Sequence, residues 1–275
     1  TSIQVLTEWV TTPGSTLWTK ETVISPDGKH VYHLTGTSNG AATLSVFQRN
    51  ANTGLLTFIS MTGGAPTGTD GIEGYARGLA ITHDGKRVMV NSYEDEGGLL
   101  TVFDRNAQTG SLTMRNAIRG ATGELGNAGS IALSEDDTFI YVTRKKSGDT
   151  WQLIRYTRDG ANTDYYIDDR LETTAGSSFH PGSISGIRLP ADGLQAYILD
   201  YSNRALSVHP RDPETGIITM DPISTHYSSG PGDLRVTPDG KTVVLIAILD
   251  GSIRTFARTP STGHISEVDY IGGGK

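Results

Sequence analysis

The chain has 275 residues, 36% of them hydrophobic, which is enough to bury the core of one large domain or of two small ones. Its net charge of −7, with dispersed basic residues, argues against binding to nucleic acid or to an anionic membrane, because both need a basic face. The absence of cysteine excludes disulfides and thiolate chemistry, and it fits an exported bacterial protein as well as a cytosolic one.

The first predicted element is a strand near the N-terminus, from Ile3 to Val10, within residues 1–12. It resembles the fourth strand of the repeats that follow, although the last repeat already has its own fourth strand, Ile265–Tyr270. We therefore interpret residues 1–12 as an extra outer strand.

The rest of the chain repeats one pattern five times, at intervals of about 47 to 57 residues, which is typical of propellers or solenoids. Each repeat has two apolar strands joined by a tight polar turn, and Asp-Gly in such a turn favours a hairpin because glycine adopts positive φ without strain. The turns are Ser25–Lys29, Thr82–Lys86, Ser134–Asp137, Pro190–Gly193 and Thr237–Lys241. The repeats span residues 15–62, 75–120, 127–172, 182–224 and 231–272.

The second repeat illustrates the prediction. Its two hairpin strands are Gly78–Thr82 and Val88–Asn91, its third strand is Leu99–Phe103, and its fourth begins at Leu112. Four antiparallel strands make one propeller blade. The sequence thus predicts a single all-β domain over residues 1–275, a β-propeller of four-stranded antiparallel blades. Five blades are favoured, and six stay open if the two ends of the chain share an incomplete blade.

The third strand of each repeat ends in an arginine, and in four repeats a Thr-Gly turn follows. Because these arginines recur once per repeat, we interpret them as structural braces of the turn rather than as site residues. The third repeat departs from the pattern, with Arg158-Asp159-Gly160 in place of the usual turn. The four regular turns are Arg49–Gly54, Arg105–Gly110, Arg211–Gly216 and Arg258–Gly263.

Two of these motifs, Ser25–Tyr32 and Leu44–Gly54, carry a resemblance that extends over nearly the whole chain. The sequence resembles the lactonase-like β-propeller family, which includes 6-phosphogluconolactonase and the carboxymuconate-cyclising enzymes. The resemblance implies the propeller fold, and it implies lactone chemistry at a central mouth lined by His, Arg and Glu. Family enzymes usually have seven blades, whereas this sequence predicts five.

The segments that lead into the first strand of each blade converge on one mouth of a propeller, so we expect any catalytic residues there. Lactone chemistry needs a base and a group that stabilises an oxyanion. If the protein is an enzyme, His180 is the candidate base, Arg77 the candidate binder of an oxyanion or carboxylate, and Glu21 or Glu73 the orienting acid. The structural alternative is that His180 and Arg77 close the central channel by hydrogen bonds.

The loops between the second and third strands differ between repeats, and variable loops on a repeated scaffold are typical of a binding face. Aromatic side chains in these segments could stack on a sugar ring. The candidate ligand-binding residues are Trp18, Tyr75, Tyr93, Tyr201, Asn203 and Asp233. The other histidines never fall at metal-ligand spacing, so we expect no metal site and no cofactor.

Three functions stay open. The first is a non-catalytic binding or scaffold propeller that engages a glycan, a small sugar acid or a protein through its loop-rich face, as an extracellular or periplasmic monomer. The second is a metal-independent lactonase or cycloisomerase that acts at the central mouth. The third is a blade segment of a longer extracellular adhesin. The longest apolar run, Val243–Leu249, is too short to span a membrane, and a cytoplasmic location also stays open.

Overall fold

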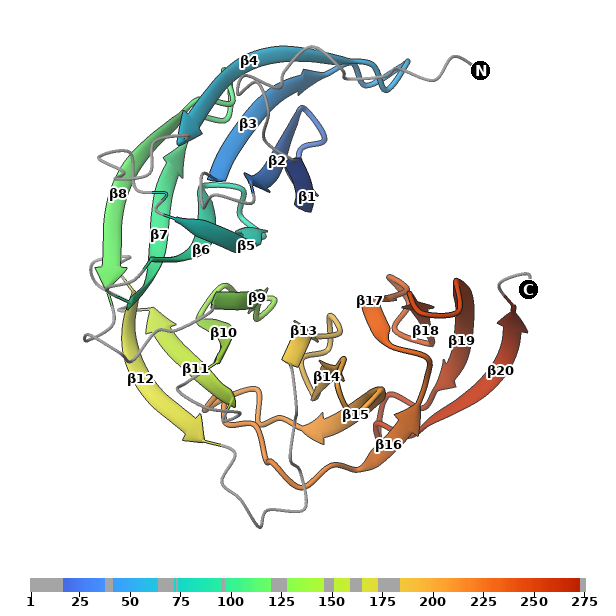
Figure 1. Ribbon diagram of the computed structural model, residues 1–275. Helices are drawn as coiled ribbons and strands as arrows, with labels where there is room; N and C mark the ends of the chain where they lie inside the picture. The colour runs from blue at the N-terminus through green and yellow to red at the C-terminus, as the bar shows by residue number, and fades with distance from the viewer. Residues whose placement is uncertain are drawn as a thin grey trace. The chain divides into compact units, whose positions relative to one another are not determined.

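The computed structural model describes residues 17–37, 42–63, 72, 74–94, 97–119, 128–145, 151–158, 165–172 and 184–272. These residues form twenty β-strands in five four-stranded antiparallel sheets (Figure 1). No helix among them is long and apolar enough to cross a membrane. The predicted fold class, all-β with four-stranded antiparallel propeller blades, is confirmed. The strand predicted within residues 1–12 lies outside the described residues, and the single domain and the closure of five or six blades stay predictions.

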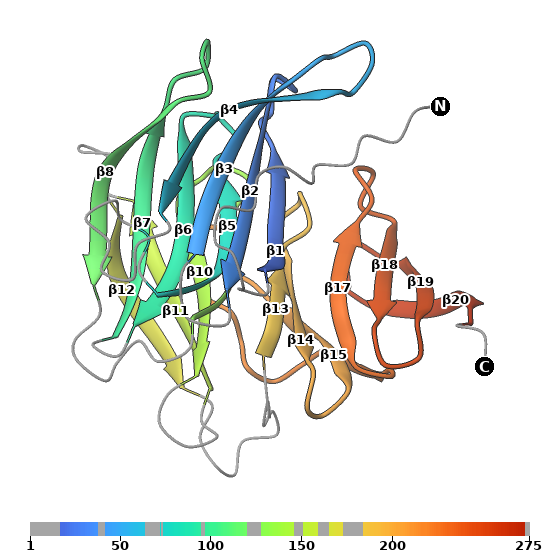
Figure 2. The same cartoon turned by 45° about the horizontal axis from the view of Figure 1, so that its top comes forward.

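The chain divides into two compact units, Thr1–Ala128 and Gly129–Lys275. Unit 1 contains blades 1 and 2. Blade 1 consists of β1 (Leu17–Ile24), β2 (His30–Thr37), β3 (Ala42–Arg49) and β4 (Leu56–Gly63). Blade 2 consists of β5 (Tyr75–Ile81), β6 (Arg87–Glu94), β7 (Gly97–Arg105) and β8 (Leu112–Arg119). Figure 2 shows these two sheets lying face to face.

Unit 2 contains blades 3, 4 and 5. Blade 3 consists of β9 (Ala128–Leu133), β10 (Phe139–Lys145), β11 (Trp151–Arg158) and β12 (Tyr165–Glu172). Blade 4 consists of β13 (Ile184–Arg188), β14 (Gln195–Asp200), β15 (Ala205–Pro210) and β16 (Ser224–Tyr227). Blade 5 consists of β17 (Pro231–Val236), β18 (Thr242–Ala247), β19 (Ser252–Arg258) and β20 (Ile265–Ile271).

Local side-chain bonds explain why the polar turns form hairpins. In blade 1, the Asp27 carboxylate accepts a hydrogen bond from the Lys29 amide at 3.1 Å, and the Ser25 hydroxyl accepts one from the His30 amide at 3.0 Å. Gly28 supplies the positive φ of 69° that the turn requires. The turn thus joins β1 to β2 through bonds that residues close in sequence can make.

The cores lie between adjacent blades of one unit. In unit 1, Leu34 and Leu44 of blade 1 belong to the same buried cluster as Val90 and Phe103 of blade 2. In unit 2, one cluster joins blades 4 and 5 through apolar side chains of their middle strands and of β17: Tyr197, Leu199, Leu206, Val208, Leu234, Val243, Leu245 and Phe256. Each middle strand therefore buries apolar residues against the next sheet, as blades packed face to face require.

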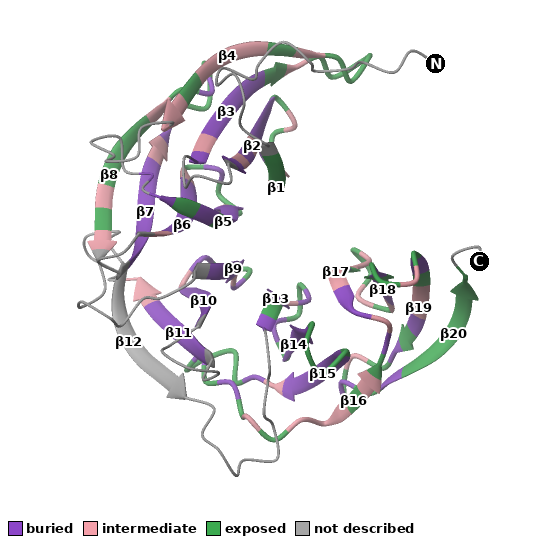
Figure 3. Ribbon diagram, viewed as in Figure 1, coloured by how far each residue is buried: buried purple, intermediate pink, exposed green. Residues whose placement is uncertain are grey.

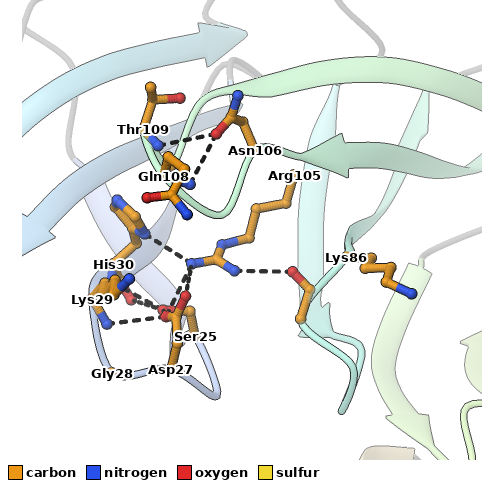
Figure 4. A network of polar contacts seen from close by, with 12 residues as sticks. Ser25, Asp27, Gly28, Lys29, His30, Lys86, Arg105, Asn106, Gln108 and Thr109 are labelled. Atoms are coloured by element: carbon orange, nitrogen blue, oxygen red, sulfur yellow. Dashed lines mark hydrogen bonds and ion pairs between the residues drawn. The ribbon is translucent and has the colours of Figure 1, made fainter.

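An arginine at the end of the third strand joins each of these pairs. In unit 1, Arg105 of blade 2 reaches blade 1, where its guanidinium donates to both carboxylate oxygens of Asp27 at 3.0 and 2.9 Å and lies 2.8 Å from His30 Nδ1 (Figure 4). It also donates to the Tyr32 hydroxyl at 2.8 Å and to the Gly85 carbonyl of its own hairpin at 3.0 Å. We call this arrangement the arginine latch.

Unit 2 contains two latches of the same kind. Arg211 of blade 4 donates to the Tyr141 hydroxyl of blade 3 at 2.7 Å and to a carbonyl of its own hairpin at 2.7 Å. Arg258 of blade 5 donates to the Asp192 carboxylate of blade 4 at 2.9 Å and to its own hairpin at 2.8 Å. These arginines have the structural role expected from their repetition, but they brace the preceding blade as well as their own turn.

The glycine of the Thr-Gly turn is the second part of each latch. Gly110 and Gly216 have φ values of 74° and 71°. A Cβ at Gly110 would lie 2.4 Å from the His30 ring of blade 1, and one at Gly216 would lie 2.6 Å from the Phe139 ring of blade 3. The turn therefore sits directly on the preceding blade, and glycine is needed there both for its backbone conformation and for the close approach.

Candidate functional site

The first strand of four blades carries a β-bulge at the same position. The register of β1 shifts around Lys20 and that of β5 around Arg77, while β13 and β17 shift around Ser185 and Gly232. A bulge bends its strand and changes the direction in which a side chain points, and bulges are common beside active sites. The same backbone irregularity thus occurs in several blades, and in blades 1 and 2 the bulged residue is a cation.

Lys20 and Arg77 influence each other electrostatically. Burial lowers the pKa of the Lys20 ammonium, and the positive charge of Arg77 lowers it further. Lys20 Nζ lies 4.8 Å from the centroid of the Trp18 ring, and a Cβ on Gly36 would approach Lys20 Cε to 3.1 Å. Neither cation forms an ion pair in the part of the chain that the structure describes. Two cations without an ion-pair partner among the described residues, on the first strands of adjacent blades, favour an anionic ligand.

Glu21 follows Lys20 and connects the two blades. Its Oε2 atom accepts a hydrogen bond from the backbone amide of Leu79, at 3.1 Å. Leu79 lies two residues after Arg77 on β5, which is an edge strand of its sheet. The Glu21 carboxylate therefore holds the backbone next to the Arg77 bulge, which is a positioning contact rather than a contact with a reacting group.

Three of the predicted aromatic residues lie on strands of blades 1 and 2: Trp18 on β1, Tyr75 on β5 and Tyr93 on β6. Tyr75 and Tyr93 face each other across β5 and β6, with ring centroids 5.2 Å apart and an interplanar angle of 21°. Tyr75 is 39% exposed and Trp18 is 46% exposed, so both present part of a ring to solvent. The structure therefore places five predicted site residues in unit 1, together with a lysine that was not predicted. We call this set the bulge site: Trp18, Lys20, Glu21, Tyr75, Arg77 and Tyr93.

The other predicted ligand-binding residues lie in unit 2. Tyr201 follows β14 in the turn to β15 and is 37% exposed. Asn203 lies in the same turn, where its side-chain Nδ2 donates to Asp200 Oδ2 at 2.8 Å and its amide donates to Asp200 Oδ1 at 3.1 Å. The Asn203 side chain thus fixes the turn, and the ligand-binding roles of both residues stay predictions.

Asp233 is held by two arginines. Its Oδ1 atom accepts hydrogen bonds from Arg188 at 2.9 Å and from Arg235 at 2.6 Å. Arg188 also donates to the Ser130 hydroxyl at 2.7 Å, so it links the first strands of blades 3, 4 and 5. This network occupies one oxygen of a carboxylate that the sequence analysis assigned to ligand binding, and it gives Asp233 a structural role as well.

His180 and Glu73, the predicted base and one of the predicted orienting acids, lie outside the described residues. Sequence reasoning missed Lys20 and Arg188. Lys20 could have been found by alignment, because it precedes Ser25 by the same five positions that separate Arg77 from Thr82. Arg188 is the last residue of β13, and nothing in the sequence around it indicates that it would bind Asp233. The described residues contain no group of three or more His, Cys, Asp or Glu side chains that could hold a metal ion.

The blades define the class of the fold: a β-propeller of four-stranded antiparallel sheets. Within that class, residues 2–124 match the sequence model of a family described as lactonase, 7-bladed beta-propeller. No curated protein matches the sequence significantly. The predicted resemblance to lactonase-like propellers is thereby confirmed.

Solved structures share the fold. A candidate 6-phosphogluconolactonase from Bacteroides uniformis superposes with a TM-score of 0.65 at 16% identity, covering 91% of this chain and 84% of its own. One from Bacteroides fragilis gives 0.63 at 18% identity, with 91% and 83% covered. The periplasmic gluconolactonase of Pseudomonas aeruginosa gives 0.58 at 16% identity, with 92% and 85% covered. At these identities the likeness shows the fold alone.

The comparisons bear on the choice between the functions that the sequence left open. The family match over residues 2–124 agrees better with the enzymatic alternative than with the non-catalytic scaffold that was expected first. The matched family is named for seven blades, whereas the described residues of this chain form five sheets.

Proposed function

We propose that the protein is a metal-independent lactonase that opens the ring of a sugar-acid lactone at the bulge site. The observation that carries the proposal is the pair of cations, Lys20 and Arg77, which occupy equivalent bulges in adjacent blades and have no ion-pair partner among the described residues. Hydrolysis of a lactone develops negative charge on the carbonyl oxygen, and fixed positive groups stabilise that charge. The family match over residues 2–124 supports the same proposal.

In the proposed reaction, water attacks the carbonyl carbon of the lactone while a base removes one proton from the water. Arg77 binds the resulting oxyanion, and Lys20 binds the acidic or phosphate group of the substrate. When the ring C–O bond breaks, the departing oxygen receives the proton from the base. Glu21 is a positioning residue, because its carboxylate anchors the Leu79 amide. The resemblance implies a histidine base, and His180 stays the candidate for that role from the sequence.

Stacked and exposed rings support a sugar-acid substrate. The Trp18 ring lies beside Lys20, and the stacked rings of Tyr75 and Tyr93 belong to the first two strands of blade 2, as Arg77 does. Such flat apolar surfaces suit the apolar face of a sugar ring. We also propose a periplasmic or extracellular location, which is supported by the periplasmic gluconolactonase among the structural neighbours.

The test is hydrolysis of δ-gluconolactone and of its 6-phosphate, followed as acid release at constant pH. Removal of one oxyanion-stabilising group lowers the turnover number by about 100-fold or more in other enzymes, and we expect that loss for Arg77→Ala. The matched control is Arg115→Ala in the same blade, because Arg115 pairs with Asp104 at 3.3 Å away from the bulge. Equal activity of wild type, Arg77→Ala and Arg115→Ala would contradict the proposal.

The prediction from the sequence that His180 acts as a base needs a separate experiment. A general base that titrates produces a pH-dependent limb in kcat/KM, and that limb should disappear together with most of the activity in His180→Ala. Lys20→Met should instead raise KM for the phosphorylated lactone more than for the neutral one, because the lost cation contacts only the anionic group. An unchanged KM ratio would remove Lys20 from the site.

A further inference from the structure

The arginine latch of unit 1 contains a residue that can change its charge near neutral pH. His30 is the first residue of β2 and is 2% exposed, and its Nδ1 atom lies 2.8 Å from the guanidinium of Arg105 in blade 2 (Figure 4). A guanidinium only donates hydrogen bonds, and it keeps its charge in a protein. His30 Nδ1 therefore accepts this bond, which requires a neutral ring with its proton on Nε2.

The His30 ring is packed beneath the Thr-Gly turn of blade 2. A Cβ on Gly110 would lie 2.4 Å from this ring. The Tyr32 hydroxyl donates to the Gly110 carbonyl at 3.0 Å and thereby holds the turn over the ring, and burial raises the pKa of Tyr32, so the hydroxyl stays protonated. Figure 3 shows that β2 and β7 are buried over most of their length. The histidine is thus enclosed between two blades of one compact unit.

The charges around His30 favour the neutral ring. Burial and the charge of Arg105 lower the pKa of His30, and Lys29 lowers it further, whereas Asp27 raises it. Both carboxylate oxygens of Asp27 already accept hydrogen bonds from Arg105, at 3.0 and 2.9 Å, so an imidazolium would compete with the guanidinium for the same anion. The residue opposite His30 on β3 is the uncharged Gln48.

The two latches of unit 2 have residues that do not titrate at this position. Phe139 of blade 3 and Gln195 of blade 4 each follow the start of their hairpin turn by the same five positions as His30 does. The glycine of the next Thr-Gly turn would place a Cβ 2.6 Å from Phe139 and 2.7 Å from Gln195. Gln195 Oε1 accepts a hydrogen bond from Arg258, as His30 Nδ1 does from its own arginine. A neutral acceptor or an apolar ring therefore suffices for the packing, and only the latch of unit 1 adds a titratable group.

We propose that His30 is a pH-sensitive switch, which releases the arginine latch between blades 1 and 2 in mildly acidic solution. When Nδ1 takes a proton from the solvent, it can no longer accept the bond from Arg105. A second cation then lies beside the guanidinium inside a buried joint, where like charges repel more strongly than in water. The Thr-Gly turn of blade 2 separates from β2 as a result. The proposal does not depend on the proposed enzymatic activity.

The direction of the pH dependence follows from linkage. The pKa of His30 is lower in the closed latch than in an open one, where the ring is hydrated and titrates at about 6.5. The neutral ring therefore stabilises the closed latch above about pH 6.5, and this stability is lost as the pH falls. Because one proton is taken up, the equilibrium constant for opening should rise by up to about tenfold for each unit of pH below that value.

The experiment is amide hydrogen exchange of the full chain between about pH 7.5 and about pH 5, corrected for the intrinsic effect of pH on exchange. In wild type, the corrected exchange of the Arg105–Gly110 turn should rise as the pH falls. In His30→Gln it should stay constant, because glutamine keeps an acceptor for the guanidinium and cannot titrate. Gln195→His is the matched gain of function in blade 4, and it should give the Arg258–Gly263 turn the same rise in acid.

Two further measurements keep the result interpretable. Melting temperatures show whether the variants are folded, and His30→Phe, which copies blade 3, replaces His30→Gln should that variant fail to fold. The other histidines are present in wild type and in both His30 variants, so their titration cancels in the comparison. An NMR titration should find the His30 ring neutral at pH values near 7.5, with its proton on Nε2.

Three results would overturn the proposal. The first is an equal rise in the exchange of the Arg105–Gly110 turn in wild type and in the folded His30 variant. The second is a His30 ring that carries its proton on Nδ1 at neutral pH, because such a ring could not accept a bond from the guanidinium. The third is a folded Gln195→His variant in which the Arg258–Gly263 turn exchanges as it does in wild type.

Discussion

The arginine latch of unit 1 makes a quantitative prediction about stability. The Arg105 side chain is 2% exposed and donates to Asp27, Tyr32 and Gly85, while Asp27 is 31% exposed. Removing one partner of a buried ion pair costs about 3 to 5 kcal/mol. Because Asp27 is partly hydrated and can recover some solvation, we expect Arg105→Ala to lower the free energy of unfolding by about 3 kcal/mol, near the lower end of that range.

Arg49→Ala is the matched control, since it removes the same side chain from the same position of blade 1. Within the described residues the Arg49 side chain donates one hydrogen bond, to Gly28 at 3.2 Å, so its loss should cost at most about 1 kcal/mol. Urea denaturation at low protein concentration measures both changes, with the slope against urea checked for constancy. If the two variants lose the same stability, the contacts with the preceding blade contribute nothing and the latch argument is wrong.

Three further predictions concern the same scaffold. His209 is buried, with ring nitrogens bonded to Ser207 and Thr219, and burial lowers its pKa to about 4. Because protonation then favours the unfolded chain, the free energy of unfolding should fall as the pH drops from about 6.5 to 4. A pH series of denaturation curves should show this fall, and His209→Gln should flatten it. Gly110→Ala should destabilise the protein by about 2 kcal/mol more than Gly54→Ala, because both residues have positive φ but only Gly110 would also clash; equal melting temperatures would contradict this. Burial alone would raise the pKa of Asp27, but hydrogen bonds from Ser25 and Arg105 hold this pKa well below its usual range. The stability that the Asp27 carboxylate contributes is therefore present above about pH 4 and lost in acid. In an acid denaturation series, the free energy of unfolding of Asp27→Asn should fall less steeply than that of wild type.

The blade architecture could be predicted because its signals are local. The Asp84-Gly85 turn predicts strands at Gly78–Thr82 and Val88–Asn91, and the structure has β5 at Tyr75–Ile81 and β6 at Arg87–Glu94. Glycine at positive φ and an aspartate that accepts a nearby amide act within a few residues, so the turn can be recognised from sequence. The strand ends were missed because they depend on the length of the pairing partner across the sheet.

The latch partners could not be predicted in the same way. Arg105 was correctly interpreted as structural, yet its acceptor Asp27 lies 78 residues earlier in the chain. Neither periodicity nor turn chemistry carries information about which distant residue a guanidinium will meet. The contact follows only once two blades pack face to face, and that packing places the end of a third strand beside the hairpin of the preceding sheet.

For the candidate site, the position of a residue within the repeat predicts whether it lies at the bulge, whereas the residue type alone does not. Arg77 was proposed because an arginine suits lactone chemistry, while Lys20 was overlooked although both occupy the bulge of a first strand. The corresponding residues in β13 and β17 are Ser185 and Gly232, so the bulge is retained while its side chain changes.

The bulge recurs in four blades with a different side chain each time. The turns and latches differ, because most blades repeat both their backbone conformation and their side chains. Asp-Gly and Thr-Gly recur in most blades because glycine suits the positive φ of these turns, and in blade 3 Asp137 takes the glycine position of the hairpin at a φ of 58°. The bulged residue has no such duty, because the shift in register depends on an extra residue and not on its chemistry. Substitution there can alter binding without unfolding a blade. Variation between the repeats of one chain therefore indicates where a propeller can hold a site, even where the residues themselves suggest no known motif.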